Sequence, residues 1–154
     1  MERPIPTRPC WVEISPRAFE DNYQLLRTVA PPESELLAIV KADAYGHSLA
    51  LCAPGAVRAG AQWLGVTSVE EAVFARSFCP AARIVVMGGL FPSQVAAVIA
   101  HRLIPAVWEP FQLDALETAA RAASAAPGSV PVHLEIDSGM SRQGALPEGL
   151  AGLL

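Results

Sequence analysis

Residues 63–78 read WLGVTSVEEAVFARSF, and this stretch contains the strand-helix pattern that indicates the fold class. The run 63–67 is apolar without polar alternation, as expected for a β-strand covered on both faces. Ser68 follows directly, and Glu71 stands three residues later, which is the capping-box pattern that begins a helix. The residues up to Phe78 continue that helix. The stretch therefore predicts one strand followed by one helix.

The same unit recurs along the chain. Apolar strands are predicted at residues 36–40, 63–67, 83–87, 103–108 and 130–137, and helices at about 48–59, 69–78, 93–101 and 111–125. A strand at 11–14 precedes them, followed by a helix that begins after Ser15 and ends before Pro31. Alternating strands and helices form parallel βαβ units. The pattern fits either a doubly wound sheet or a β/α barrel and does not choose between them.

The composition favours a globular protein. The chain has 154 residues, of which 52% are hydrophobic, and this length is enough to bury a core. A net charge of −4 without a lysine or arginine cluster argues against binding to nucleic acid or to an anionic membrane. Cys10, Cys52 and Cys79 are scattered, which predicts free thiols in a reducing compartment. No secretory or membrane-spanning segment is visible, so we expect a cytoplasmic protein.

A lysine stands where the strand at 36–40 ends. Lys41 leads directly from this apolar run into a polar turn that contains Gly46. Desolvation at the carboxyl end of a parallel strand makes a primary amine a nucleophile toward carbonyls, as a Schiff base requires. For a lone lysine, simple exposure to water would be the better explanation. The residues around Lys41 favour the other interpretation, a desolvated lysine that forms a Schiff base.

Residues 40–47, VKADAYGH, resemble the pyridoxal-phosphate attachment motif of the alanine racemases. The resemblance implies that Lys41 forms the internal aldimine with pyridoxal 5′-phosphate and serves as one of two bases at the substrate Cα. It implies that the Tyr45 hydroxyl contacts the cofactor phosphate. Gly46 is expected to adopt a backbone conformation that bulky residues avoid. Ser48 departs from the glycine usual at its position in the family.

Residues 137–144, DSGMSRQG, are similar to a second motif of the same family. The resemblance implies that Arg142 reaches the cofactor phenolate and the substrate carboxylate. A guanidinium suits this role because it stays charged and pairs with carboxylates through a planar fork. Many family members carry a carbamylated lysine where this chain has Glu135. We hypothesise that Glu135 supplies the same negative charge and positions Arg142.

Three candidate metal ligands alternate along the last predicted strand. His133, Glu135 and Asp137 share one face of it. Same-face neighbours on a strand lie about 6.6 Å apart, so three of them do not converge on one ion. We therefore expect no metal site.

The resemblance implies a fold and a reaction for the whole chain. Residues 15–154 would form a partial (β/α)8 barrel of about five βα units, and residues 1–14 a strand segment before it. The reaction would interconvert L- and D-alanine and supply D-alanine for peptidoglycan, in a homodimer with its active site at the interface. The second base would be a tyrosine from the C-terminal domain of the partner subunit.

The length of the chain conflicts with a complete enzyme of this family. An eight-stranded barrel needs about 250 residues, so we expect the barrel to be incomplete and the C-terminal β domain to be absent. Tyr23 lies on the first helix and Tyr45 already has a role, so neither is a candidate for the second base. We expect the chain alone to be inactive. Two alternatives stay open, a non-catalytic pyridoxal-phosphate-binding barrel protein and an inactive racemase fragment.

Overall fold

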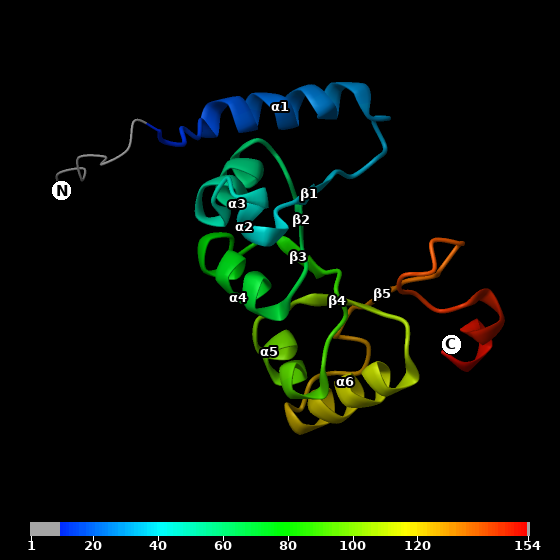
Figure 1. Ribbon diagram of the computed structural model, residues 1–154. Coiled ribbons are helices and arrows are strands. Elements are labelled where there is room, and N and C mark those ends of the chain that lie inside the picture. The colour runs from blue at the N-terminus through cyan, green and yellow to red at the C-terminus, as the bar shows by residue number, and fades with distance from the viewer. Residues whose placement is uncertain (1–9, 154) are drawn as a thin grey trace.

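The strands lie side by side in one parallel sheet. The computed structural model describes residues 10–153 (Figure 1). Its five strands are β1 (Leu37–Ile39), β2 (Trp63–Val66), β3 (Arg83–Val86), β4 (Ile104–Val107) and β5 (His133–Leu134). They follow one another across the sheet in chain order, and each neighbouring pair is parallel. The predicted series of five parallel strands with helices between them is confirmed.

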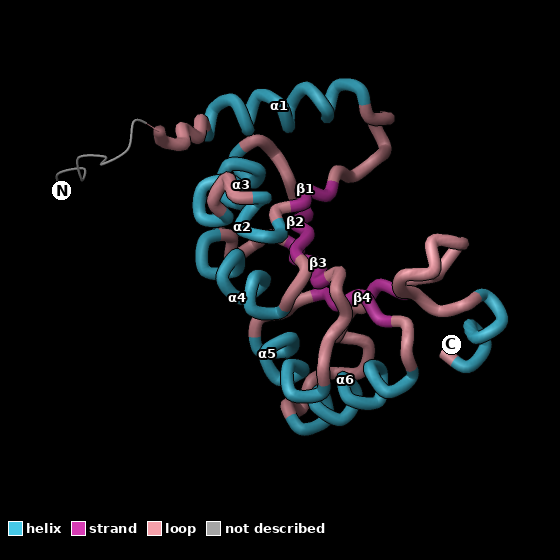
Figure 2. Tube along the Cα trace, viewed as in Figure 1, coloured by secondary structure: helices cyan, strands magenta, loops and turns pink. Residues whose placement is uncertain are grey.

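The helices lie along one side of this sheet (Figure 2). They are α1 (Pro16–Val29), α3 (Leu49–Arg58), α4 (Val69–Phe78), α5 (Val95–Ala100) and α6 (Pro110–Ala122), and the short α2 (Lys41–Tyr45) follows β1. A doubly wound sheet reverses its strand order at a switch point and has helices on both faces. The described residues show a single direction of strand order and one helical layer. The chain therefore forms a sector of a β/α barrel, which is the choice that the sequence pattern left open.

Local signals begin the helices where they were predicted. The Ser15 hydroxyl accepts a hydrogen bond from the backbone N–H of Ala18 at the start of α1, at 3.2 Å. At α4 the Ser68 hydroxyl accepts from the Glu71 N–H at 3.2 Å, and the Glu71 carboxylate in turn accepts from the Ser68 N–H. The predicted capping box is therefore present. Two short 3-10 segments, η1 (Pro92–Gln94) and η2 (Pro147–Gly152), also begin at prolines.

The core lies between the sheet and the helices. Branched side chains on the strands, such as Leu64, Val66, Ile84 and Val86, are fully buried there, as is Val40 directly after β1. They pack against small residues on the helices, including Ala53, Ala56, Ala72 and Ala75, which are also fully buried. Alternate strand residues point to the opposite face, where Leu37 and Ile39 are 39% and 36% exposed. Leu37, on that second face, lines the cavity of the candidate site.

Two predicted strands differ from the structure. The strand at 11–14 is wrong: residues 10–15 are irregular, and Val12 is 82% exposed. Apolar alternation does not make a strand without a neighbouring backbone to pair with, and no strand in the described residues lies beside this segment. Residues 1–9 of the predicted segment 1–14 lie outside the described residues. The strand at 130–137 shrinks to His133–Leu134, because Pro131 has no N–H to donate and Ile136 bridges to Ala145 instead.

The remaining sequence predictions concern thiols and membranes. Cys52 and Cys79 are buried, Cys10 is exposed, and all three are free thiols, as predicted. Burial raises the pKa of both buried thiols above the ordinary value. Over residues 10–153, no helix has the length and apolar character needed to cross a bilayer.

Candidate active site

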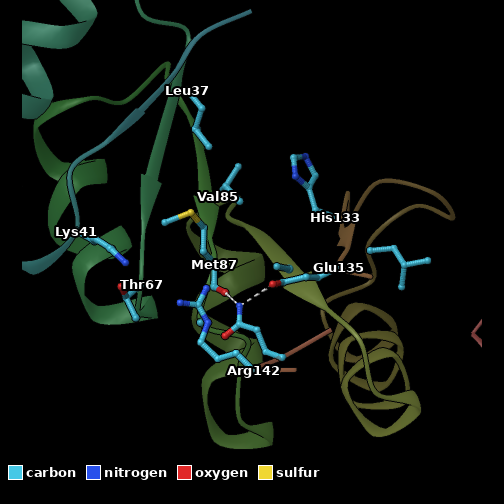
Figure 3. Close-up of a pocket in the computed structure, with 12 residues that line it drawn as sticks. Leu37, Lys41, Thr67, Val85, Met87, His133, Glu135 and Arg142 are labelled. Carbon is cyan, nitrogen blue, oxygen red and sulfur yellow. Dashed lines mark hydrogen bonds between the residues drawn. The ribbon is translucent and has the colours of Figure 1, made fainter. Parts of the chain in front are cut away.

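A cavity of about 560 Å³ opens at the carboxyl ends of the strands (Figure 3). Lys41, Thr67, Met87 and Glu135 line it, and each comes just after a strand. The other lining residues are Leu37, Val85, Gly88, Ala106, His133, Leu134, Arg142 and Gln143. Barrel enzymes place their active sites at this end of the sheet, and cavities of about 300–1,000 Å³ are typical of small-molecule sites. The structure thus brings Lys41 and Arg142, from two distant motifs, into one cavity.

Lys41 begins a turn of left-handed helix. The N–H of Val40 still bonds to the sheet, donating to the Gly65 carbonyl at 2.8 Å. The next five residues have positive φ: 52° at Ala42, 51° at Asp43, 54° at Ala44, 55° at Tyr45 and 83° at Gly46. Left-handed backbone costs about 1–2 kcal/mol per non-glycine residue. The positive φ predicted for Gly46 is confirmed, but four residues with side chains share it, which no sequence signal indicated.

Two carboxylates connect this turn to neighbouring elements. One oxygen of Glu71, on α4, accepts the Ala42 N–H at 2.7 Å. The Asp43 carboxylate accepts the Leu49 N–H at 2.6 Å and so connects the turn to the start of α3. Sequence reasoning found Glu71 only as a helix cap. Its contact with Ala42 spans 29 residues of chain, so it had no local signal.

Tyr45 does not line the cavity that contains the other two predicted site residues. Its side chain is 61% exposed and is not among the residues that line the cavity. Tyr45 stands four residues after Lys41, at the end of the left-handed turn. The contact between Tyr45 and a cofactor phosphate therefore stays a prediction.

The loop that carries Arg142 is organised by Asp137. The Asp137 carboxylate accepts backbone N–H bonds from Gly139 at 2.9 Å and from Ser141 at 3.0 Å. These bonds, the one from Ser141 first, hold the pKa of Asp137 below its ordinary value. Gly144 closes the loop with φ 106°, where a Cβ atom would stand 2.6 Å from the Asp137 backbone nitrogen. Arg142 itself is exposed at the edge of the cavity.

Glu135 contacts the neighbour of Arg142 in the chain. Both of its carboxylate oxygens accept from Gln143 Nε2, at 2.9 and 2.8 Å, and the same nitrogen donates to the Met87 carbonyl at 2.9 Å (Figure 3). Gln143 was not singled out in the sequence, where it stands between two motif residues. Through Gln143, Glu135 is connected to the loop that carries Arg142. Among the described residues, no three His, Cys, Asp or Glu side chains are arranged to hold a metal ion.

Comparison with known proteins identifies this arrangement. The family model described as "Alanine racemase, N-terminal domain" matches residues 14–154. The chain belongs to the alanine racemase family. It is 40% identical over 143 residues to the alanine racemase of Geobacillus kaustophilus, covering 92% of this chain and 36% of the relative. It is 38% identical over 148 residues to that of Acidithiobacillus ferrooxidans, covering 96% of this chain and 39% of the relative.

Solved alanine racemases share the fold. The enzyme of Streptomyces lavendulae superposes with a TM-score of 0.82 at 35% identity, over 91% of this chain and 36% of that one. The Bartonella henselae racemase, which carries covalently bound pyridoxal phosphate, gives a TM-score of 0.78 at 28% identity, over 91% of this chain and 38% of that one. The chain thus spans a little over a third of these relatives. The five strands correspond to part of their barrel.

Proposed function

We propose that this chain is the lysine-bearing part of a pyridoxal-phosphate-dependent racemase that interconverts L- and D-alanine. The observation that carries the proposal is the meeting of Lys41 and Arg142 at one cavity, at the carboxyl ends of the strands, in a member of the alanine racemase family. The covalently bound cofactor in the Bartonella relative supports the same reading.

The residues of the cavity fit such a cofactor. Lys41 offers a primary amine and Arg142 a guanidinium, which suit an aldehyde and an anionic group of the same molecule. When bound, pyridoxal phosphate would supply an electron sink for a carbanion at the substrate Cα. Lys41 would bond covalently to the aldehyde carbon with loss of water. The substrate amino group would displace it from that carbon, and the freed Lys41 amine would then move a proton on one face of the Cα. Arg142 would orient the substrate carboxylate, and Tyr45 would contact the phosphate.

Racemisation requires a proton to leave one face of the Cα and another to arrive on the opposite face. We propose that the second base is a tyrosine of a partner subunit in a homodimer, and that the D-alanine formed serves peptidoglycan synthesis. The shared names of the relatives support alanine as the substrate.

Attachment of the cofactor gives a direct test. Lys41 is the only lysine in residues 1–154, so an adduct on a lysine of this part of the protein must be at that position. Adding pyridoxal phosphate should give absorbance at roughly 420 nm, the region of a protonated cofactor-lysine bond. Borohydride reduction should leave a stable adduct on the peptide that contains Lys41. The Lys41→Ala variant should show neither signal.

The same preparation separates the alternative functions. An adduct at Lys41 together with conversion of L-alanine to D-alanine by the protein as its gene encodes it would support the racemase. An adduct without racemisation would point to a non-catalytic pyridoxal-phosphate-binding barrel. If Lys41 forms no adduct, the proposal fails and an inactive fragment is the better description.

A further inference from the structure

We propose that Glu71 is a positioning residue for Lys41. Its carboxylate holds the left-handed turn that begins at Lys41 against the start of α4, and so fixes where the amine of Lys41 enters the cavity. The inference rests on the proposed function, because it assigns Glu71 a part in presenting the amine to a carbonyl cofactor. Glu71 would touch neither cofactor nor substrate, since it is not among the residues that line the cavity.

Each oxygen of the Glu71 carboxylate serves a different strand end. Oε1 accepts the N–H of Ala42, the residue after Lys41, at 2.7 Å. Oε2 accepts the N–H of Thr67 at 2.8 Å and that of Ser68 at 3.4 Å. Lys41 and Thr67 lie side by side at the cavity (Figure 3). One half-buried side chain thus ties together the backbones that follow β1 and β2.

Two other helical segments of the same chain show what a cap alone requires. At α6 a single oxygen of Gln112 accepts the N–H groups of Trp108 and Glu109, at 2.8 and 3.0 Å. At η1 the amide oxygen of Gln94 accepts the Phe91 N–H at 3.0 Å. An amide therefore suffices to cap a segment that begins after a strand of this sheet.

The start of α4 differs because a further donor, the Ala42 N–H, faces the second oxygen of the capping Glu71 side chain. A glutamine has one acceptor oxygen and one donor nitrogen, whereas a carboxylate accepts at both atoms. A glutamine at position 71 with its oxygen on the cap would turn its NH2 group toward the Ala42 N–H. Only a carboxylate can accept hydrogen bonds both from the Ala42 N–H and from the N–H groups at the start of α4. The choice of glutamate at this position is thus explained by the turn at Lys41 rather than by the helix.

The turn needs this support because of its backbone conformation. Ala42 is the first of four consecutive non-glycine residues with positive φ, which sterics disfavour for L-residues. Such conformations persist only where the surroundings over-determine them. Asp43 provides a bond toward α3, and Glu71 provides the bond next to Lys41. Loss of the Glu71 bond would let the turn relax at the end that carries the amine.

Two charge-removing variants test this role. Glu71→Gln keeps the size of the side chain and its ability to cap α4, but removes the acceptor for Ala42. Glu70→Gln is the matched control, since Glu70 stands in the same helical turn and accepts from Gln94 Nε2 at 3.0 Å, away from the Lys41 turn. Both are made in the protein as its gene encodes it. Hydrogen exchange of backbone amides and the rate of borohydride-trapped adduct formation at Lys41 are measured.

In Glu71→Gln the Ala42 amide should exchange at least about tenfold faster, since it loses a charge-assisted hydrogen bond, while amides within α4 keep their protection. The rate of adduct formation at Lys41 should fall by about ten- to a hundredfold, the effect expected when a reacting group is misplaced by about 1 Å. Glu70→Gln should match the parent in both measurements. Glu71→Ala should additionally expose the amides at the start of α4, which separates the cap from the positioning role.

The two proposals fail in different ways. If the parent protein forms no adduct at Lys41, the proposed function is wrong, and exchange of the Ala42 amide alone then decides whether Glu71 holds the turn. If the parent forms the adduct and Glu71→Gln forms it at the same rate, Glu71 is only a helix cap and the inference is overturned. Unchanged exchange at Ala42 in Glu71→Gln overturns it as well.

Discussion

Removing the amide of Gln143 should destabilise the loop that carries Arg142. In the folded chain Gln143 Nε2 bonds at once to the Glu135 carboxylate and to the Met87 carbonyl. A hydrogen bond to a charged group contributes about 1.5–3 kcal/mol and one between neutral groups about 1 kcal/mol. Both side chains are half-buried, so water replaces part of what is lost. We expect Gln143→Ala to lower the free energy of unfolding by about 2 kcal/mol.

Urea unfolding measures this loss. With a slope of about 2 kcal/mol per molar urea, the midpoint should fall by about 1 M in Gln143→Ala. A double-mutant cycle with Glu135→Ala isolates the contact between the two side chains, and its coupling energy should be about 1–2 kcal/mol. Glu70→Gln is a control, because it alters a Glu–Gln pair on the surface, and surface substitutions of this kind stay within about 0.5 kcal/mol.

A coupling energy below about 0.5 kcal/mol, the range expected for independent sites, would refute the reasoning. The bond would then be of no energetic consequence, and Glu135 could not act on Arg142 through Gln143. The functional counterpart is Glu135→Gln in the protein as its gene encodes it. If this variant binds cofactor and a substrate analogue as the parent does, the hypothesis that Glu135 replaces the carbamylated lysine fails.

Two further predictions concern a glycine and a carboxylate. A Cβ on Gly89 would stand 2.6 Å from the ring of Trp108, whereas one on Gly128, with the same φ of 74°, would meet nothing within 4 Å. In thermal unfolding, Gly89→Ala should therefore lower the free energy of unfolding by about 2–4 kcal/mol and Gly128→Ala by only about 1 kcal/mol. Equal losses in the two variants would contradict the steric argument. The pKa of Asp137 is lowered on folding, so its contribution to stability is present above the unfolded pKa of about 3.9 and is lost as the pH falls through the lower folded value. Urea midpoints should accordingly separate parent from Asp137→Asn at pH 6 and converge toward pH 2; a constant gap would exclude this linkage.

Much of the fold and part of the site were predictable because their signals are local. Apolar runs and the Ser68 capping box placed five strands and gave α4 its observed bounds. Two motifs singled out Lys41 and Arg142, which line the same cavity. The strand at 11–14 failed because alternation describes the side chains of a segment, whereas a strand also needs a partner backbone. Tyr45 does not line that cavity, and the left-handed turn that carries it had no sequence signal.

The sequence by itself determined the order of strands and helices, their caps and the family motifs, since each depends on residues close together in the chain. Only the tertiary structure decided that the helices lie on one side of the sheet and that the strand order follows the chain without reversing, as in a barrel. It also joined Glu71 to Ala42 and Gln143 to Met87. These contacts link residues far apart in sequence, and the geometry that brings their atoms within hydrogen-bonding distance exists only after the sheet has formed.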